Sequence, residues 1–253
     1  MDFDISRLLE DWAYEPGHVV VRRFRGKDGV EKIQLRVDLG LLQMNVDGRP
    51  DGKRPFGHPS LFEFHQARLY RHLAEHGGSD AQFKLDAEAC AKLQIEALQY
   101  HHRYICLLEL GDCAGVIRDA ERNLAVFDFV GQHAESEEAA WSLRQFEPQL
   151  RMILTRARGA QALQGDDYPL AVQEVEAGIE KIRAFYAEYA RPEAAEQSGE
   201  LLSLEEWLEE IRSKRPLSRR EKLERALHEA VRSENYEKAA KVRDELRNLP
   251  SER

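Results

Sequence analysis

The stretch EKLERALHEAVRSENYEKAAKVRDELRNL, residues 221–249, contains two runs of helical periodicity joined by a short polar turn. Apolar residues recur at intervals of three and four in each run, which predicts two amphipathic helices packed along one seam. The first helix would contribute Leu223, Leu227, Ala230 and Val231 to the seam, and the second Ala239, Val242, Leu246 and Leu249. The turn falls at 233–236, where Tyr236 is expected to cover the open end of the seam. A helical hairpin over residues 217–249 is therefore predicted.

A hairpin of about 30 residues buries little apolar area and is marginally stable alone. Such units gain stability by packing on a partner protein or on a second copy of themselves, so an apolar stripe left open on the hairpin is a candidate interface. The residues expected at the contact are Leu227, Val231, Tyr236, Ala240, Arg243, Asp244 and Leu246. The predicted partner is a protein, with self-association as one form of it.

This segment resembles the UVR motif. The residues that carry the resemblance are Leu223, Ala230, Tyr236-Glu237, Ala239-Ala240 and Arg243-Asp244-Glu245-Leu246. The motif is named for the excinuclease B and C subunits of bacterial nucleotide excision repair. It also occurs in activators of the bacterial protein-arginine kinase and in some Clp-type chaperone ATPases. The resemblance implies a bacterial protein with a docking hairpin, in which Arg243 and Asp244 form ion pairs that orient the partner. No helicase or nuclease domain of the excinucleases is similar to the rest of the chain, and the CxxC pairs of the kinase activators are absent.

The N-terminal part has the period of β-structure. A short helix over residues 2–13 is followed by Val19-Val20-Val21, a turn at 26–29, and strict alternation from Ile33 to Leu39, which predicts an antiparallel hairpin. After Gly40 the apolar residues move from odd to even positions. A slip of one residue turns the apolar side chains to the opposite face, so Gly40-Leu41 is either a bulge or a junction between two strands.

Residues after about 56 have helical periodicity throughout. Ser60 with Glu63 forms a capping box, and Gly77-Gly78 closes the helix that follows it. Pro148 divides the stretch 137–164, and Tyr168-Pro169 begins another helix. Residues 191–199 are interpreted as a linker or frayed end, with a short helix starting at Ser203. A second capping box, Ser218-Arg-Arg-Glu221, precedes the hairpin.

Two joints in the middle of the chain have a Gly-Asp corner, Leu110-Gly111-Asp112 and 164–168. The second is similar to a tetratricopeptide repeat, because Gly165, Tyr168, Ala177 and Ala184 stand at that repeat's Gly/Tyr and small-residue positions, where helices approach closely. Lys181 stands where the repeat has an aromatic residue, and the joints are 54 residues apart instead of about 34. The region is thus either a tetratricopeptide-like array or an irregular helical bundle.

The fold class is therefore mainly α, with a small N-terminal antiparallel β hairpin or sheet, a helical-repeat-like array and a C-terminal helical hairpin. The predicted domains are residues 1–56, 57–200 and 201–253. The net charge of −9 disfavours direct nucleic-acid binding, which depends on Lys and Arg neutralising phosphates. Three cysteines without a CxxC pair favour a reducing compartment, and no apolar run reaches the length of about 20 residues needed to span a bilayer. A cytoplasmic protein is expected.

Candidates for chemistry are weak. His65, His72 and His76 share one helical face, yet without an HExxH pattern they are explained equally well as exposed histidines near a helix end. The loop from Asp47 to Asp51 lacks the ligand spacing of a calcium loop and is interpreted as a turn. No nucleotide-binding or nucleophile motif is present. We expect no catalytic residues, metal or cofactor.

Three functions are compatible with the sequence. The first is a non-enzymatic adaptor or scaffold that docks through the hairpin. The second is an accessory role in nucleotide excision repair, exerted through a repair-protein partner. The third is an enzyme or ligand sensor with a polar site at the N-terminal sheet, lined by Asp38, Asp47 or Arg49.

Overall fold

The computed structural model describes residues 4–189, 192–216 and 219–247. As predicted, the protein is mainly α-helical, with one small antiparallel sheet near its N-terminus and a pair of helices near its C-terminus. The chain divides into two compact units between residues 208 and 209, within helix α9. The predicted domain boundaries stay predictions. No helix in the described part of the chain is both long and apolar enough to cross a membrane.

The sheet has three strands in the order β1-β2-β3: Val21–Arg25, Glu31–Val37 and Gly40–Asn45. In the β2–β3 register Ile33 pairs with Met44 and Val37 with Gly40. Because a two-residue turn joins these strands, odd positions of β2 face even positions of β3, which explains the slip in the apolar pattern. The slip marks a junction between strands, but the turn lies at residues 38–39 and not at Gly40-Leu41. Leu39, predicted as a strand residue, is 92% exposed.

The predicted N-terminal helix is much shorter than expected. Helix α1 covers only Ser6–Leu9, and Phe3 lies outside the described residues. Trp12 is not helical, and its ring lies 4.0 Å from the Arg22 guanidinium of β1. Helical periodicity had placed Trp12 on an amphipathic helix. A cation–π contact with the sheet holds it instead.

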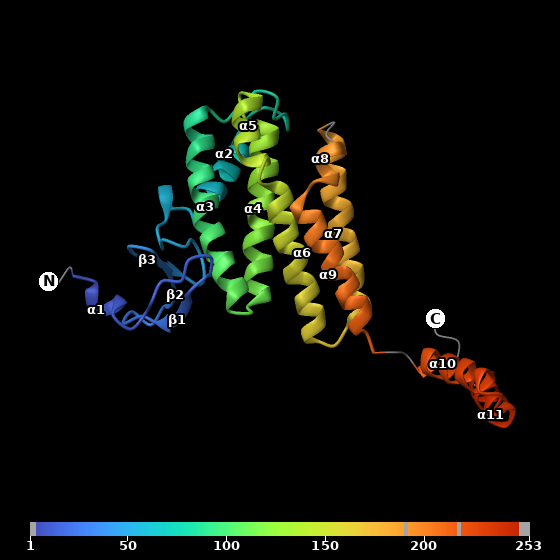
Figure 1. Ribbon diagram of the computed structural model, residues 1–253. Coiled ribbons are helices and arrows are strands. Elements are labelled where there is room, and N and C mark those ends of the chain that lie inside the picture. The colour runs from blue at the N-terminus through green and yellow to red at the C-terminus, as the bar shows by residue number, and fades with distance from the viewer. Residues whose placement is uncertain (1–3, 190–191, 217–218, 248–253) are drawn as a thin grey trace. The chain divides into compact units, whose positions relative to one another are not determined.

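Helices make up most of the first unit (Figure 1), and several of them begin at a side-chain cap. After the short 3-10 helix η1 Pro55–Gly57 they are α2 Leu61–Glu75, α3 Ala87–Glu109, α4 Cys113–His133, α5 Glu137–Arg144, α6 Glu147–Gln164, α7 Tyr168–Glu188 and α8 Pro192–Glu196. Helix α9 Gly199–Lys214 begins in the first unit and ends in the second. Ser60 caps α2, accepting from the backbone N–H groups of Phe62 and Glu63. Pro148 lies in the first turn of α6 and Pro169 in that of α7, so both predicted boundaries are confirmed. Helices α3, α4, α6 and α7 pack each against the next in a row.

The prediction of a linker or frayed end at residues 191–199 was wrong for most of this segment, and Arg191 lies outside the described residues. Residues 192–196 form α8, and α9 begins at Gly199, before the start predicted at Ser203. Ser198 precedes the helix, and its hydroxyl accepts from the N–H of Leu201 at 3.3 Å. Leu201 and Leu204 are buried at 4% and 0% exposure, so tertiary packing extends this helix through a segment whose composition indicated a loop.

Two helix corners have the same hydrogen-bond pattern. Gly111, between α3 and α4, and Asp166, between α6 and α7, have φ of 70° and 57°. The next residue, Asp112 or Asp167, accepts from the backbone N–H three residues later at 3.0 Å. Its own N–H donates to the carbonyl five residues earlier, at 2.9 and 3.0 Å. In the second corner the left-handed residue is Asp166 and not Gly165, whose φ is −93°.

A small residue does bring α6 and α7 together, but at a different position from the predicted ones. Ala177 and Ala184 are exposed. The close approach between α6 and α7 occurs at Gly178, where a Cβ atom would lie 2.0 Å from the Thr155 hydroxyl oxygen. A side chain at Gly178 would force the two helices apart. The tetratricopeptide likeness itself stays a prediction.

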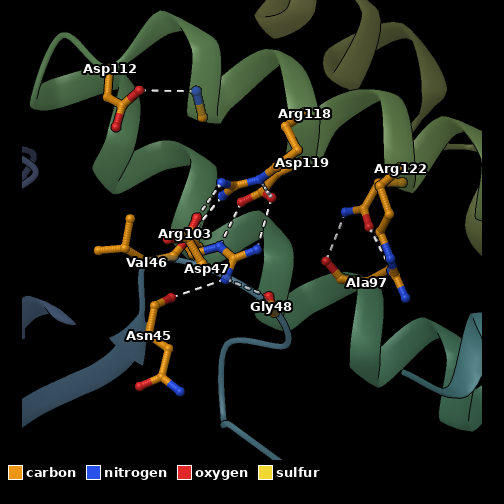
Figure 2. A network of polar contacts seen from close by, with 12 residues as sticks. Asn45, Val46, Asp47, Gly48, Ala97, Arg103, Asp112, Arg118, Asp119 and Arg122 are labelled. Carbon is orange, nitrogen blue, oxygen red and sulfur yellow. Dashed lines mark hydrogen bonds and ion pairs between the residues drawn. The ribbon is translucent and has the colours of Figure 1, made fainter. Parts of the chain in front are cut away.

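A buried arginine ties the β3–α2 loop to the helices (Figure 2). Arg103 of α3 is 1% exposed and donates to both carboxylate oxygens of Asp119 on α4, at 2.6 and 2.8 Å. A third nitrogen donates to the carbonyl oxygens of Asn45 and Gly48, at 3.0 and 2.7 Å. Arg118 donates to Asp47 of the same loop at 2.9 Å. The loop is therefore fixed by charge-assisted hydrogen bonds on helix side chains.

A buried carboxylate fixes the start of helix α2. Glu96 of α3 is fully buried and accepts from the N–H groups of Leu61 and Phe62 at 2.8 and 3.3 Å. Arg122 of α4 contacts the same carboxylate, and Arg49 lies 3.5 Å from it. Negative charge at a helix N-terminus is favourable, so Glu96 anchors the start of α2 from a neighbouring helix.

Candidate docking surface on the C-terminal hairpin

Beyond the end of α9, the second unit contains the helices α10 Arg219–Arg232 and α11 Tyr236–Arg247, joined by a tight corner. Glu234 has φ of 55°, and Asn235 accepts from the N–H of Lys238 at 3.1 Å. The N–H of Asn235 donates to the carbonyl of Ala230, five residues back, at 2.8 Å. The predicted turn at 233–236 is confirmed, and its pattern repeats that of the two corners in the first unit.

The seam between the two helices is narrow. Its buried residues are Ala230, Ala239 and Val242, at 1%, 8% and 8% exposure. Leu223, Leu227 and Leu246 are half-buried. Val231, predicted as a seam residue, is 51% exposed, since it lies about 100° around the helix from the buried Ala230. Leu217, Ser218 of the predicted capping box and Leu249 lie outside the described residues.

Tyr236 does not cover the end of the seam, and that prediction was wrong. It is the first residue of α11 and is 69% exposed. Ala240 and Arg243 follow at i+4 and i+7, which places the three residues along one stripe of the helix beside the seam. The large aromatic ring is consequently available at the surface of the hairpin.

The predicted contact residues fall into two groups by exposure. Val231, Tyr236, Arg243 and Asp244 are exposed, whereas Leu227, Ala240 and Leu246 are half-buried. The helical spacing brings Tyr236, Ala240 and Arg243 together on α11 and pairs Leu227 with Val231 on α10. Leu246 instead aligns with Ala239 and Val242 of the seam. Their role in binding a partner stays a prediction.

Residues 218–250 match the sequence model of the family described as the UvrB/uvrC motif. The match covers the hairpin alone. The resemblance of this segment to the UVR motif is thereby confirmed, and we refer to α10 and α11 as the UVR-like hairpin. No curated protein and no solved structure matches the chain.

Charged side chains on the UVR-like hairpin form local pairs. Arg243 donates to the Asp244 carboxylate at 3.0 Å, and Lys241 lies 2.9 Å from the Glu237 carboxylate. The side chains of both pairs are more than half exposed. Exposed pairs of this kind contribute little to stability, so Arg243 and Asp244 can exchange partners at low cost.

The histidines of α2 have packing partners. The rings of His72 and His76 stack with their centroids 3.9 Å apart, and His76 Nδ1 lies 2.8 Å from the His72 carbonyl oxygen. His65 is buried, and its Nδ1 lies 3.1 Å from Arg68. Among the described residues, no group of three or more His, Cys, Asp or Glu side chains is arranged to hold a metal ion.

The three cysteines are free and buried. Burial raises the pKa of the thiols of Cys90, Cys106 and Cys113, that of Cys106 to about 12. A thiol with a raised pKa is a poor nucleophile at neutral pH, because the thiolate is the reactive form. These side chains therefore act as small core residues.

Two of the three residues named for a polar N-terminal site are engaged in structural contacts. Asp47 pairs with Arg118, and Arg49 lies 3.0 Å from Asp51 and 3.5 Å from the buried Glu96. Asp38 is exposed in the turn between β2 and β3. The turn interpretation of the loop from Asp47 to Asp51 agrees with these contacts, and the site hypothesis stays a prediction.

The sequence did not predict an apolar cavity that opens between helices α3, α4, α5 and α6. Its edge includes Ile95 and Leu98 of α3, which are 61% and 51% exposed. These residues lie outside the face that Leu93, Ala97 and Tyr104 bury. The sequence signal for the cavity was therefore the presence of apolar residues on α3 outside the face that packs in the core.

Proposed function

We propose that the protein is a non-enzymatic adaptor that docks on a partner protein, or on a second copy of itself, through the UVR-like hairpin. The observation that carries the proposal is the contrast between a narrow seam and an open apolar surface. Among the described residues of the hairpin, Ala230, Ala239 and Val242 are the buried ones, while Val231 and Tyr236 are 51% and 69% exposed.

The physical reason is the small core of the hairpin. Two helices of 14 and 12 residues that bury three small or medium side chains are close to the limit of independent stability. A partner that covers Tyr236 and Val231 would add apolar burial at about 25 cal/mol per Å². Exposed aromatic residues beside an arginine are also a common composition of interface centres.

An accessory role in nucleotide excision repair is the second candidate, favoured by the family description of the hairpin alone. In this version the partner is a repair protein. The net charge of −9 disfavours direct contact with DNA. For either role we propose a bacterial cytoplasmic location, which free, buried Cys90, Cys106 and Cys113 support.

Affinity capture with matched variants tests the docking role. The intact chain is compared with a Tyr236→Ala, Arg243→Ala double variant and with a Tyr70→Ala, Arg71→Ala control. Tyr70 and Tyr236 are both 69% exposed, so the control removes the same kind of side chains from another helix. We expect the first variant to lose the captured proteins and the control to keep them.

Self-association is measured in parallel by sedimentation of the purified chains over a range of concentrations. If a second copy is the partner, the hairpin variant alone shifts toward monomer. Equal capture and equal sedimentation for all three chains would refute the docking proposal. Identification of a captured repair protein by mass spectrometry would favour the second candidate.

A further inference from the structure

The apolar cavity between α3, α4, α5 and α6 has the properties of a small-molecule site. Its volume is about 380 Å³, within the range of about 300–1,000 Å³ that ligand pockets occupy. Buried side chains from four helices line its inner part, namely Ala97, Tyr104, Phe127, Leu143 and Leu150. A cavity of this size would seat a molecule of one to three rings.

The edge of the cavity is also apolar. Among the lining residues, Ile95 and Leu98 of α3 and Phe146, just before α6, are 61%, 51% and 48% exposed. Large apolar side chains at a surface are ordinary when scattered singly, but here three of them line one cavity. An apolar ligand would cover these side chains as well as those inside.

The lining lacks formal charge. One third of the chain is charged, yet no Asp, Glu, Lys or Arg is among the described residues that line this cavity. A second cavity over α4, α6 and α7 has the opposite character, with Asp128, Arg158 and Lys181 among its lining residues. Charged ligands need compensating groups when they lose water, so a site without them selects neutral ones.

A few neutral polar groups converge on the same space. The Nδ1 atom of His101 lies 2.7 Å from the Tyr104 hydroxyl oxygen, and the amides of Gln94 and Gln149 lie along the walls. Burial lowers the pKa of His101, which keeps the ring uncharged at neutral pH. With Nδ1 engaged, Nε2 is the ring nitrogen left to meet a hydrogen-bonding group of a ligand.

We propose that this cavity binds an uncharged, largely apolar small molecule of one to three rings that carries a single hydrogen-bonding group directed at His101. The proposal does not depend on the docking role of the UVR-like hairpin. An inserted apolar side chain of a protein partner is the alternative occupant. A compact site of about 380 Å³, lined in part by buried side chains of four helices, favours the small molecule.

Two matched probes test the charge requirement with the intact chain. N-phenyl-1-naphthylamine is uncharged and has one N–H donor, whereas 1-anilinonaphthalene-8-sulfonate has the same rings with an added anion. Fluorescence titration should show saturable binding of the neutral probe at one site. The anionic probe should bind at least about tenfold more weakly, because the cavity offers its sulfonate no positive charge.

A pair of leucine variants tests the location. Leu98 at the cavity edge and Leu202 on α9 are each 51% exposed, so Leu98→Glu and Leu202→Glu add the same charge to equally exposed sites. We expect Leu98→Glu to weaken binding of the neutral probe at least about tenfold and Leu202→Glu to change it less than twofold. Ile95→Glu is a second edge variant, and thermal melting checks that each chain is folded.

Three results would overturn the proposal. They are no saturable binding of the neutral probe, equal binding of the two probes, and equal effects of Leu98→Glu and Leu202→Glu in folded chains. A fourth result would also contradict it. If all variants bind the neutral probe with equal affinity and a purified partner protein displaces the probe, the cavity edge is a protein contact.

Discussion

The helix pairs α6–α7 and α10–α11 turn through the same kind of corner. Asp166 and Glu234 have φ of 57° and 55°, and each is followed by a capping side chain, Asp167 or Asn235. In both pairs the amide of the capping residue donates to the carbonyl five residues earlier. The local chemistry that reverses the chain is thus nearly identical in the two regions.

Their burial is very different. Helix α7 alone buries Ala171, Val175, Gly178, Ile179, Ile182 and Phe185, whereas α10 and α11 together bury Ala230, Ala239 and Val242 among their described residues. Helix α6 also packs on α4. A corner therefore determines the path of the chain, while the neighbours of a helix pair determine its stability. This difference is why the UVR-like hairpin is the better candidate for docking.

The largest expected difference between the regions concerns ion pairs. Asp119→Ala would leave Arg103 buried without its carboxylate and should destabilise the first unit by about 3–5 kcal/mol. Asp244→Ala removes an exposed partner of Arg243 and should cost about 0.5 kcal/mol or less. Urea unfolding followed by tryptophan fluorescence measures the first effect, because all three tryptophans lie in residues 1–208. Similar small effects of both variants would mean that the buried pair is not needed for stability.

Apolar burial provides the second test. Val175→Ala in α7, at 0% exposure, should destabilise the first unit by about 2 kcal/mol. Val242→Ala in α11, at 8% exposure, should leave that unfolding transition unchanged and increase amide hydrogen exchange throughout α10 and α11. A lowered midpoint of the tryptophan transition in Val242→Ala would show that the two regions unfold together, which contradicts the comparison.

The sequence predicted most of the helices and strands because these depend on local patterns. The change of the apolar positions from odd to even between Val37 and Met44 indicated a strand junction, and Ser60 and Pro169 marked helix starts. Long-range effects were missed. Arg103 and Asp119 belong to different helices, and nothing in their spacing distinguishes a buried pair from solvated charges.

The same limit applies to the candidate sites. The hairpin could be predicted because one continuous segment forms it, although Val231 and Tyr236 are more exposed than their apolar character indicated. The cavity could not be predicted, since its lining comes from four helices and depends on how they pack. Ile95 and Leu98 are apolar residues outside the buried face of α3, but Phe127 and Leu150, which line the same cavity, are distant from them in sequence.

Removal of the capping side chain should cost the same free energy in the two helix pairs, but the measurable result should differ between them. Asp167→Ala and Asn235→Ala each remove one hydrogen bond to a helix N-terminus and should cost about 1 kcal/mol. In the first unit this cost lowers the urea midpoint slightly. In the hairpin it should increase hydrogen exchange about fivefold, since local opening needs little additional free energy. Equal protection of both helix pairs in the unmodified chain would contradict this expectation.

The smallest expected effect concerns the replacement of the left-handed residue of a corner by glycine, and the reverse change at Gly111 sets the scale of the strain. Gly111→Ala places a side chain at φ of 70° with no atom within 4 Å of the new Cβ, so backbone strain of about 1 kcal/mol is the main cost. Glu234→Gly removes the same strain from the hairpin, but the flexible glycine stabilises the unfolded chain by a similar amount. We expect a net gain of a few tenths of a kcal/mol, visible as slower hydrogen exchange near Asn235. Because Asp and Asn tolerate this conformation better than Glu, Asp166→Gly should gain less than Glu234→Gly. Faster exchange in Glu234→Gly would show that its strain is smaller than the entropy of glycine, and the corners would then differ in more than their neighbours.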